Sequence, residues 1–238
     1  MLSASNIVQT NQGSTGGTRA SSVTVTLPAA TAAGHQLIIA VVAATGGDQF
    51  GTANTLLLPS PFSIDGSVDN LAPVPHLLDG SKDTTAGETS WTVQLKKPDG
   101  SPATDAMCWW VAEVSGLHAH PARDPNTGCG AASFSSASTL AITNTGTNGV
   151  ADELCLAFFA NHAASGTPKT VSSVSNTTTQ PGTWARLGAT AVTTNSSGPN
   201  VRLDAYAKFP GAVGKRDATA HWSASVIGAA GLVDAYTS

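Results

Sequence analysis

The sequence predicts an all-β fold, a two-sheet antiparallel sandwich of jelly-roll-like type with long loops. Short β-rich runs recur along the 238 residues, separated by clusters of Gly, Pro, Asn and Ser. No long segment shows the period of about 3.6 residues that marks an amphipathic helix. The runs number about eleven, enough for two packed sheets.

Two segments show the alternation of half-buried strands. In residues 22–28, "SVTVTLP", the apolar Val23, Val25 and Leu27 alternate with threonines. In residues 201–209, "VRLDAYAKF", apolar residues alternate with a more polar set: Arg202, Asp204, Tyr206 and Lys208. Such alternation is typical of a strand with one face on the core. We therefore expect each of these strands to keep its other face in water.

Two other runs are apolar on both faces, residues 36–44 ("QLIIAVVAA") and 153–160 ("ELCLAFFA"). In an antiparallel fold this indicates central strands that are covered on both sides, by a second layer or by a neighbouring subunit. The remaining strand candidates are residues 90–96, 107–114, 138–144, 183–190, 220–227 and 231–237, with weaker ones at 4–9 and 62–68.

The chain is expected to form a single domain over residues 1–238, with 1–20 as an N-terminal arm, because neither a clear linker nor an internal repeat divides it. Three long connections, at 45–61, 117–134 and 161–182, join the expected strands. Loops of this length usually have a function, so contacts with partners are sought there first.

Only 11% of the residues are charged, against about 25% in a typical soluble domain. The surface must then consist mainly of small polar residues, with few of the Lys and Glu side chains that keep monomers apart. This composition suits a subunit of an assembly. The net charge is −4 and no basic run is present, which argues against a nucleic-acid partner.

The three cysteines are too few, and odd in number, for a disulfide framework. Cys108 and Cys155 lie in apolar runs and are expected to be buried thiols, consistent with folding in a reducing cytoplasm. The first residues lack the features of a signal peptide. The longest apolar run, residues 37–44, is far shorter than the roughly 20 residues of a membrane helix, so no membrane partner is expected.

His118, His120 and Asp124 form the most metal-like cluster of the sequence. The two histidines point the same way on an extended segment, but a metal site needs three or four converging ligands. A solvated loop is the favoured interpretation, and neither a metal nor a cofactor is expected.

Residues 65–70, "DGSVDN", space Asp65, Ser67 and Asp69 like the first ligands of a calcium loop. The twelfth position is His76 rather than Glu, so a polar strand face is favoured. Signatures of catalytic nucleophiles and of phosphate-binding loops are absent from the sequence. The chain is therefore predicted not to be an enzyme, and no catalytic residues are assigned.

The five tryptophans offer a second functional interpretation, because aromatic side chains exposed on a β-sandwich can stack against sugars. Each of them is more often a core residue. Trp184 shares a strand face with Arg186 and follows a long loop, so these two and Tyr206 are the candidate glycan platform.

The stretch "MCWWVAEV", residues 107–114, places two adjacent tryptophans on opposite faces if it is a strand. The face with Cys108 and Trp110 is assigned to the core. The other face presents Met107, Trp109 and Val111, and it needs either a second layer of the same chain or another subunit. These three residues are the candidate protein interface.

The order of these elements resembles a family of jelly-roll virion proteins of tailed phages, mainly those of actinobacteria. The resemblance depends on "GHQLIIAVVAA", "WWVAEVSGL", "SSASTLAITNTGTNGVADELCLAFFA" and "AHWSASVIGAAGLVDAY", and it spans roughly residues 20–237. It implies a capsid decoration protein, a head fibre or a minor tail protein, and it carries over no catalytic residues.

The resemblance makes a non-enzymatic capsid decoration protein the leading hypothesis, with the major capsid protein or other virion proteins as partners. It also implies a homo-oligomer, with a trimer as the specific expectation, and a location in the virion after assembly in the host cytoplasm. The alternative is a minor tail, receptor-binding or carbohydrate-binding protein that recognises host glycan. A third class, an esterase or glycosidase built from the long loops, would need clusters of Asp or His.

Overall fold

The computed structural model describes residues 1–44, 54–68, 74–120, 123–124, 129–143, 151–163, 166–176, 182–192 and 200–238. Within these ranges a short 3₁₀ helix, η1 (Ala4–Asn6), precedes fourteen strands. The strands are β1 (Ile7–Ser14), β2 (Ser22–Thr26), β3 (Gln36–Ala43), β4 (Thr55–Leu57), β5 (Ser63–Val68), β6 (His76–Asp83), β7 (Ser90–Lys96), β8 (Met107–Val114), β9 (Gly130–Thr143), β10 (Glu153–Ala163), β11 (Val171–Ser175), β12 (Ala185–Val192), β13 (Asn200–Lys208) and β14 (Asp217–Thr237).

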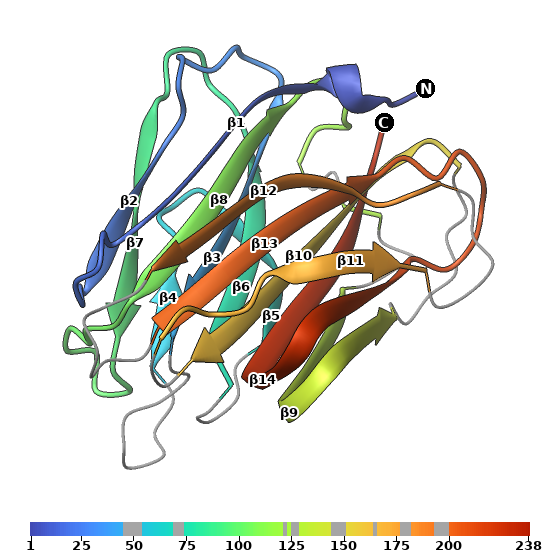
Figure 1. Cartoon of the computed structure of the whole chain (residues 1–238). Coiled ribbons are helices and arrows are strands. Elements are labelled where there is room, and N and C mark those ends of the chain that lie inside the picture. Colours follow the sequence, from blue (N-terminus) through green and yellow to red (C-terminus); the bar gives the residue numbers. More distant parts are fainter. Residues whose placement is uncertain are drawn as a thin grey trace.

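The strands form three antiparallel sheets, which pack against one another as layers (Figure 1). The first sheet has the order β1-β8-β3-β6-β5, and the second has the order β11-β14-β10-β13-β12, with β9 added along β14. A small sheet, β2-β7-β4, lies on the outer face of the first sheet. The expected all-β antiparallel sandwich is confirmed, with a third sheet that was not predicted, whereas this strand order does not establish a jelly-roll connectivity.

The first sheet is the middle layer, which explains why residues 37–44 are apolar throughout. Ile38, Ala40 and Val42 of β3 pack against the second sheet, and Leu37 and Ile39 pack toward the small sheet. All eight residues of β3 are buried. The chain itself covers both faces, as the sequence predicted for a central strand.

The two adjacent tryptophans of β8 lie in different cores. Trp110 faces the second sheet, where its ring centroid is 5.5 Å from that of Phe158. Trp109 faces the small sheet, is 5% exposed, and lies opposite Gly13 of β1. A Cβ atom on Gly13 would lie 2.5 Å from the indole, so only glycine leaves room for it.

The proposed protein interface at Met107, Trp109 and Val111 is therefore wrong. All three residues are buried in the core between the first sheet and the small sheet. The sequence shows an outward apolar face on this strand, but it does not show that β2, β7 and β4 return to cover that face.

The second sheet folds over on itself and encloses a further core. β14 pairs with β10 through its second half and with β11 through its first half, and its pairing with β9 shifts between His221 and Val226. Gly228 adopts a positive φ of 64° close to this irregularity. The fold-over covers the outer face of β10 and β13 with β9, β11 and the start of β14.

This fold-over corrects the prediction that residues 201–209 have a wet face. Asp204, Tyr206 and Lys208 of β13 are at most 5% exposed. They point into the layer enclosed by the fold-over rather than into water. By contrast, the prediction for residues 22–28 is confirmed, because Val23 and Val25 are buried while Ser22 and Thr24 are exposed.

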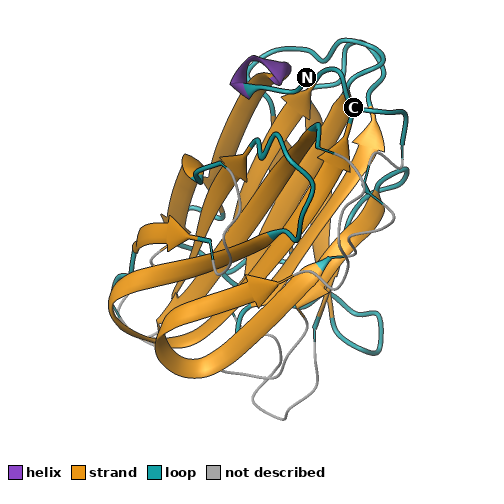
Figure 2. Ribbon diagram, turned by 90° about the vertical axis from the view of Figure 1, so that its right-hand side faces the viewer, coloured by secondary structure: helices purple, strands orange, loops and turns teal. Residues whose placement is uncertain are grey.

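Three strands, β4, β6 and β11, were not expected from the sequence, and residues 220–227 and 231–237 form one continuous strand, β14, instead of two. The N-terminal arm expected at 1–20 instead contains β1, which pairs with β8. The predicted long connections lie only partly outside the described residues, whereas Asp69 lies outside them. The connection expected at 117–134 contains the start of β9, and the one expected at 161–182 contains the end of β10 and all of β11. The two chain ends lie near each other at one end of the molecule (Figure 2). Among the described residues, no helix is long and apolar enough to span a membrane.

Candidate metal centre

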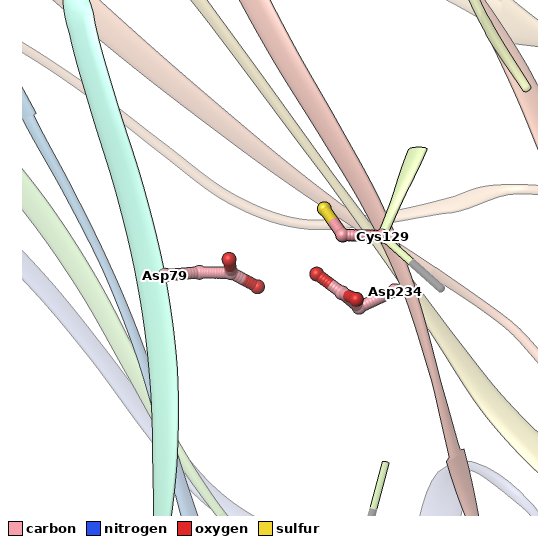
Figure 3. A group of neighbouring side chains, drawn as sticks. All are labelled: Asp79, Cys129 and Asp234. Carbon is pink, nitrogen blue, oxygen red and sulfur yellow. The ribbon is translucent and has the colours of Figure 1, made fainter. Parts of the chain in front are cut away.

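A buried acidic cluster lies between the two large sheets. Asp79 of β6 points toward Asp234 of β14, and Cys129 lies next to both at the start of β9 (Figure 3). The ligand atoms of these three side chains all lie within 4.8 Å of one another. Both aspartates are fully buried, and Cys129 is partly exposed.

The cluster owes its space to a glycine of β5. A Cβ atom on Gly66 would lie 2.3 Å from Sγ of Cys129 and 2.8 Å from Oδ1 of Asp79. The pairing of β5 with β6 shifts between Ile64 and Gly66, as at a β-bulge. Any side chain at position 66 would occupy the space that the thiol and carboxyl groups share.

Three further groups surround this space. Nε of Arg123 lies 2.9 Å from Oδ1 of Asp234, and its Nη1 donates to the main-chain oxygen of Asp65 at 2.7 Å. The hydroxyl of Tyr236 donates to Oδ2 of Asp65 at 3.0 Å. Neither carboxylate oxygen of Asp79 meets a hydrogen-bond donor among the described residues.

The cluster contains more negative than positive charge. If Asp65, Asp79 and Asp234 all ionise, Arg123 balances one of three charges and two remain in a buried site, which is costly. Burial raises the pKa of Asp79 well above its ordinary value, and the adjacent Asp234 raises it further. Burial also raises the pKa of Asp234 and of Asp65. A proton shared by Asp79 and Asp234, or a bound divalent cation, would relieve the excess charge.

The donor set favours zinc among the common divalent cations. One thiol and two carboxylates suit Zn²⁺, whereas Ca²⁺ and Mg²⁺ take oxygen ligands alone. Burial raises the pKa of the Cys129 thiol, so the metal would have to displace a thiol proton on binding. Asp79 and Asp234 come from different sheets, so a cation bound by both would hold the two layers together.

His118, His120 and Asp124, the most metal-like group of the sequence, do not converge, whereas Asp65 of the calcium-like spacing lies at the acidic cluster. His118 is exposed, and its main-chain nitrogen donates to Thr237. Nε2 of His120 lies 2.9 Å from the Ser63 hydroxyl. Asp124 is buried and hydrogen-bonds to Glu153. Two other residues of this part of the chain lie at the acidic cluster instead: Arg123, just before Asp124, and Cys129, five residues after it.

The proposed glycan platform also needs correction. Tyr206 is 5% exposed, and its ring faces Phe159 within the fold-over core. Arg186 lies beside it, and its Nε donates to the Tyr206 hydroxyl at 3.0 Å. Trp184 is half-buried, and its indole nitrogen donates to the main-chain oxygen of Asp217. The three residues lie near one another, but Tyr206 cannot offer its face to a sugar.

A separate groove of about 290 Å³ lies where β10 ends beside the bend of β14. It is lined in part by Asn161, His162, Lys169 and the exposed Ile227. His162 is 8% exposed, neither of its ring nitrogens has a hydrogen-bond partner among the described residues, and burial lowers its pKa. A neutral imidazole therefore borders a groove that could hold a small polar ligand.

Comparisons of the chain with protein-family models, with curated proteins and with solved structures gave no match. The resemblance to phage virion proteins therefore stays a prediction. Sequence reasoning missed Asp79 because its strand, β6, was not predicted at all. It missed Asp234 because this residue interrupts a segment of β14 that is otherwise apolar toward the core. A lone aspartate in such a position is the signal that could have found Asp234, since a buried carboxylate needs a partner.

Proposed function

We propose that this chain is a non-enzymatic structural protein of a tailed-phage virion that decorates the assembled head. It would bind an extended segment of a virion protein, the major capsid protein first, along the edge of β9 with which no described strand pairs. A protein that binds only the assembled particle stabilises it by mass action.

The observation that carries the proposal is the composition of β9. This strand pairs with β14 on one side, no described strand pairs with its other side, and it lies at the border of the second sheet (Figure 1). Its 14 residues include no charged residue and no proline. At about 3.4 Å per residue such an edge extends over roughly 45 Å. Edges of isolated proteins are usually shortened, charged or covered, because an open edge recruits another strand.

Two other features support a role in an assembly. Ile227, which lies opposite Ser136 of β9, is 52% exposed and adds apolar surface beside the edge. The acidic cluster is enclosed between the two large sheets, so a proton or cation shared by Asp79 and Asp234 would link the sheets and stiffen the fold. A homotrimer remains part of the proposal on the strength of the resemblance alone.

The test is co-sedimentation of the purified protein with undecorated phage capsids and with isolated host cell-wall glycan. We expect saturable capsid binding at a fixed copy number and none to glycan. The variant Ser135→Lys/Thr139→Lys, which puts charge on exposed positions of β9, should lose capsid binding. Thr92→Lys/Gln94→Lys is the matched control, because it adds the same charge to exposed positions of β7, the middle strand of the small sheet.

The alternative function, recognition of host glycan, has one observation in its favour, the groove beside His162. Binding to glycan alone, with no capsid binding, would establish that alternative and refute the decoration role. In that outcome Trp184→Ala and His162→Ala would show which surface holds the sugar. If the variant Ser135→Lys/Thr139→Lys still bound capsids like the wild type, the edge of β9 would be refuted as the contact.

A further inference from the structure

The fold-over of the second sheet brings a buried lysine against an asparagine side chain. Lys208, the last residue of β13, is 1% exposed. Its Nζ donates to Oδ1 of Asn176 at 2.8 Å. Asn176 directly follows β11, one of the strands that cover β10 and β13. The pair therefore links the two sides of the fold-over at one end of its core.

The amide of Asn176 is held with its carbonyl toward the lysine. Its Nδ2 donates to the main-chain oxygen of Gly182 at 3.2 Å, which leaves Oδ1, and with it Cγ, facing Nζ. Gly182, with a φ of 87°, packs directly on the lysine stem, since a Cβ atom there would lie 3.0 Å from Cγ of Lys208. The Trp184 ring centroid lies 4.8 Å from Nζ and shields it on another side.

Buried ionisable groups surround the lysine. Cys155 of β10 is its register partner. Asp217, the first residue of β14, raises the pKa of Lys208, and Arg216 just before it lowers that pKa. Nη2 of Arg216 lies 2.6 Å from Oε2 of Glu153. Burial is the largest influence and lowers the pKa of Lys208, which favours the neutral amine. Asp217 is fully buried, so a carboxyl group capable of moving a proton lies close to the amine.

We propose that Lys208 and Asn176 form an intramolecular isopeptide bond. The neutral Nζ attacks Cγ of Asn176, a C–N bond forms, and the bond from Cγ to Nδ2 breaks. Nδ2 leaves as ammonia after it takes up a proton that Nζ gives up, and Asp217 carries this proton between them. The reaction converts one primary amide and one amine into a secondary amide plus ammonia, so it needs no oxidant and no co-reactant.

The groups that the reaction needs are held together by the fold alone. Fixing an amine against a carbonyl group replaces a collision in solution by a reaction within one molecule. A desolvated lysine is an effective nucleophile because its neutral form is populated. The bond would join positions 32 residues apart and fasten the five-residue strand β11 to β13. Like a disulfide, it would restrict the unfolded chain, yet reducing agents would not break it.

The experiment is the intact mass of the full chain, measured after denaturation. The expected mass is about 17 Da below that of the sequence, because one ammonia is lost. Lys208→Arg keeps the positive charge but cannot form the bond, so its mass should equal that of its sequence. Asp217→Asn should also show the full mass. Tryptic digestion of the wild type should yield one peptide pair joined through Lys208 and Asn176.

Two results would overturn the proposal, and neither depends on how well a variant folds. One is a wild-type mass equal to the sequence mass. The other is a loss of about 17 Da without a linked peptide, because a succinimide at Asn148-Gly149 also releases one ammonia. A succinimide would persist in Lys208→Arg, whereas the isopeptide bond would not.

Discussion

Asp79 and Asp234 point at each other across the boundary between the two large sheets, and Cys129 completes a group whose ligand atoms lie within 4.8 Å of one another. Gly66 provides the space that this group occupies. The most polar part of the interior thus lies where the two layers meet, so the group can affect how strongly the layers hold together.

Zinc should stabilise the wild-type protein. At a free Zn²⁺ concentration about 100 times Kd, binding to the folded state contributes about 2.7 kcal/mol. For a chain of this size, that corresponds to a rise in Tm of roughly 5–10 °C. Differential scanning fluorimetry with Zn²⁺ and with Mg²⁺ measures the effect, and Mg²⁺ should give a smaller one. Cys129→Ala removes one of three donors and should abolish the zinc response; an equal response in both proteins would place zinc elsewhere.

Gly66→Ala should destabilise the protein. The added methyl group would meet Sγ of Cys129 at 2.3 Å and Oδ1 of Asp79 at 2.8 Å. Overpacking of this kind costs about 1–3 kcal/mol of unfolding free energy. Urea unfolding measures the change, with Ser67→Ala at the exposed neighbouring position as the control. A variant as stable as the wild type would show that the cluster is not packed as described.

Trp109→Ala should lower stability by about 3–5 kcal/mol, as expected for a large side chain removed from a core. Trp109 is 5% exposed under the small sheet. Trp184→Ala should cost less, because Trp184 is half-buried. Chemical denaturation of the two variants provides the comparison. Unchanged stability of Trp109→Ala, with loss of self-association, would restore the interface role that the structure contradicts.

Stability should fall as the pH rises from about 5 to about 8. Burial, together with the hydrogen bond that the protonated Glu153 donates to Asp124, raises the pKa of Glu153 to about 7 from its ordinary 4.5. Between these values the folded state holds more protons than the unfolded state, so its advantage, on the order of 3 kcal/mol, is present at low pH and lost as the pH approaches 7.

Asp124→Asn identifies the contribution of this pair. An amide at position 124 can donate to the Glu153 carboxylate, which should lower the pKa of Glu153 and flatten the dependence. Burial raises the pKa of Asp65, Asp79, Asp204 and Asp234 in both proteins alike, so the difference between the two profiles isolates the pair. Parallel profiles from urea unfolding across this pH range would contradict the assignment.

Much of the strand content could be predicted from local pattern. The alternation in residues 22–28 predicted a strand with one wet face, and β2 has that pattern. Residues 201–209 alternate just as clearly, yet β13 is covered on both faces by other parts of the same chain. Periodicity describes one strand at a time, so it cannot show what the rest of the chain places over a polar face.

The sequence by itself determined the all-β class, the central positions of the strands at 36–44 and 153–160, and the burial of Cys108 and Cys155, because these depend on local apolar pattern. Only the tertiary structure decided that β2, β7 and β4 cover Trp109, and that Asp79, Asp234 and Cys129 meet. The acidic cluster brings together positions 79, 129 and 234, and the contact between Asn176 and Lys208 brings together positions 176 and 208. Such contacts depend on sheet pairing and on the bend in β14, which no local pattern encodes.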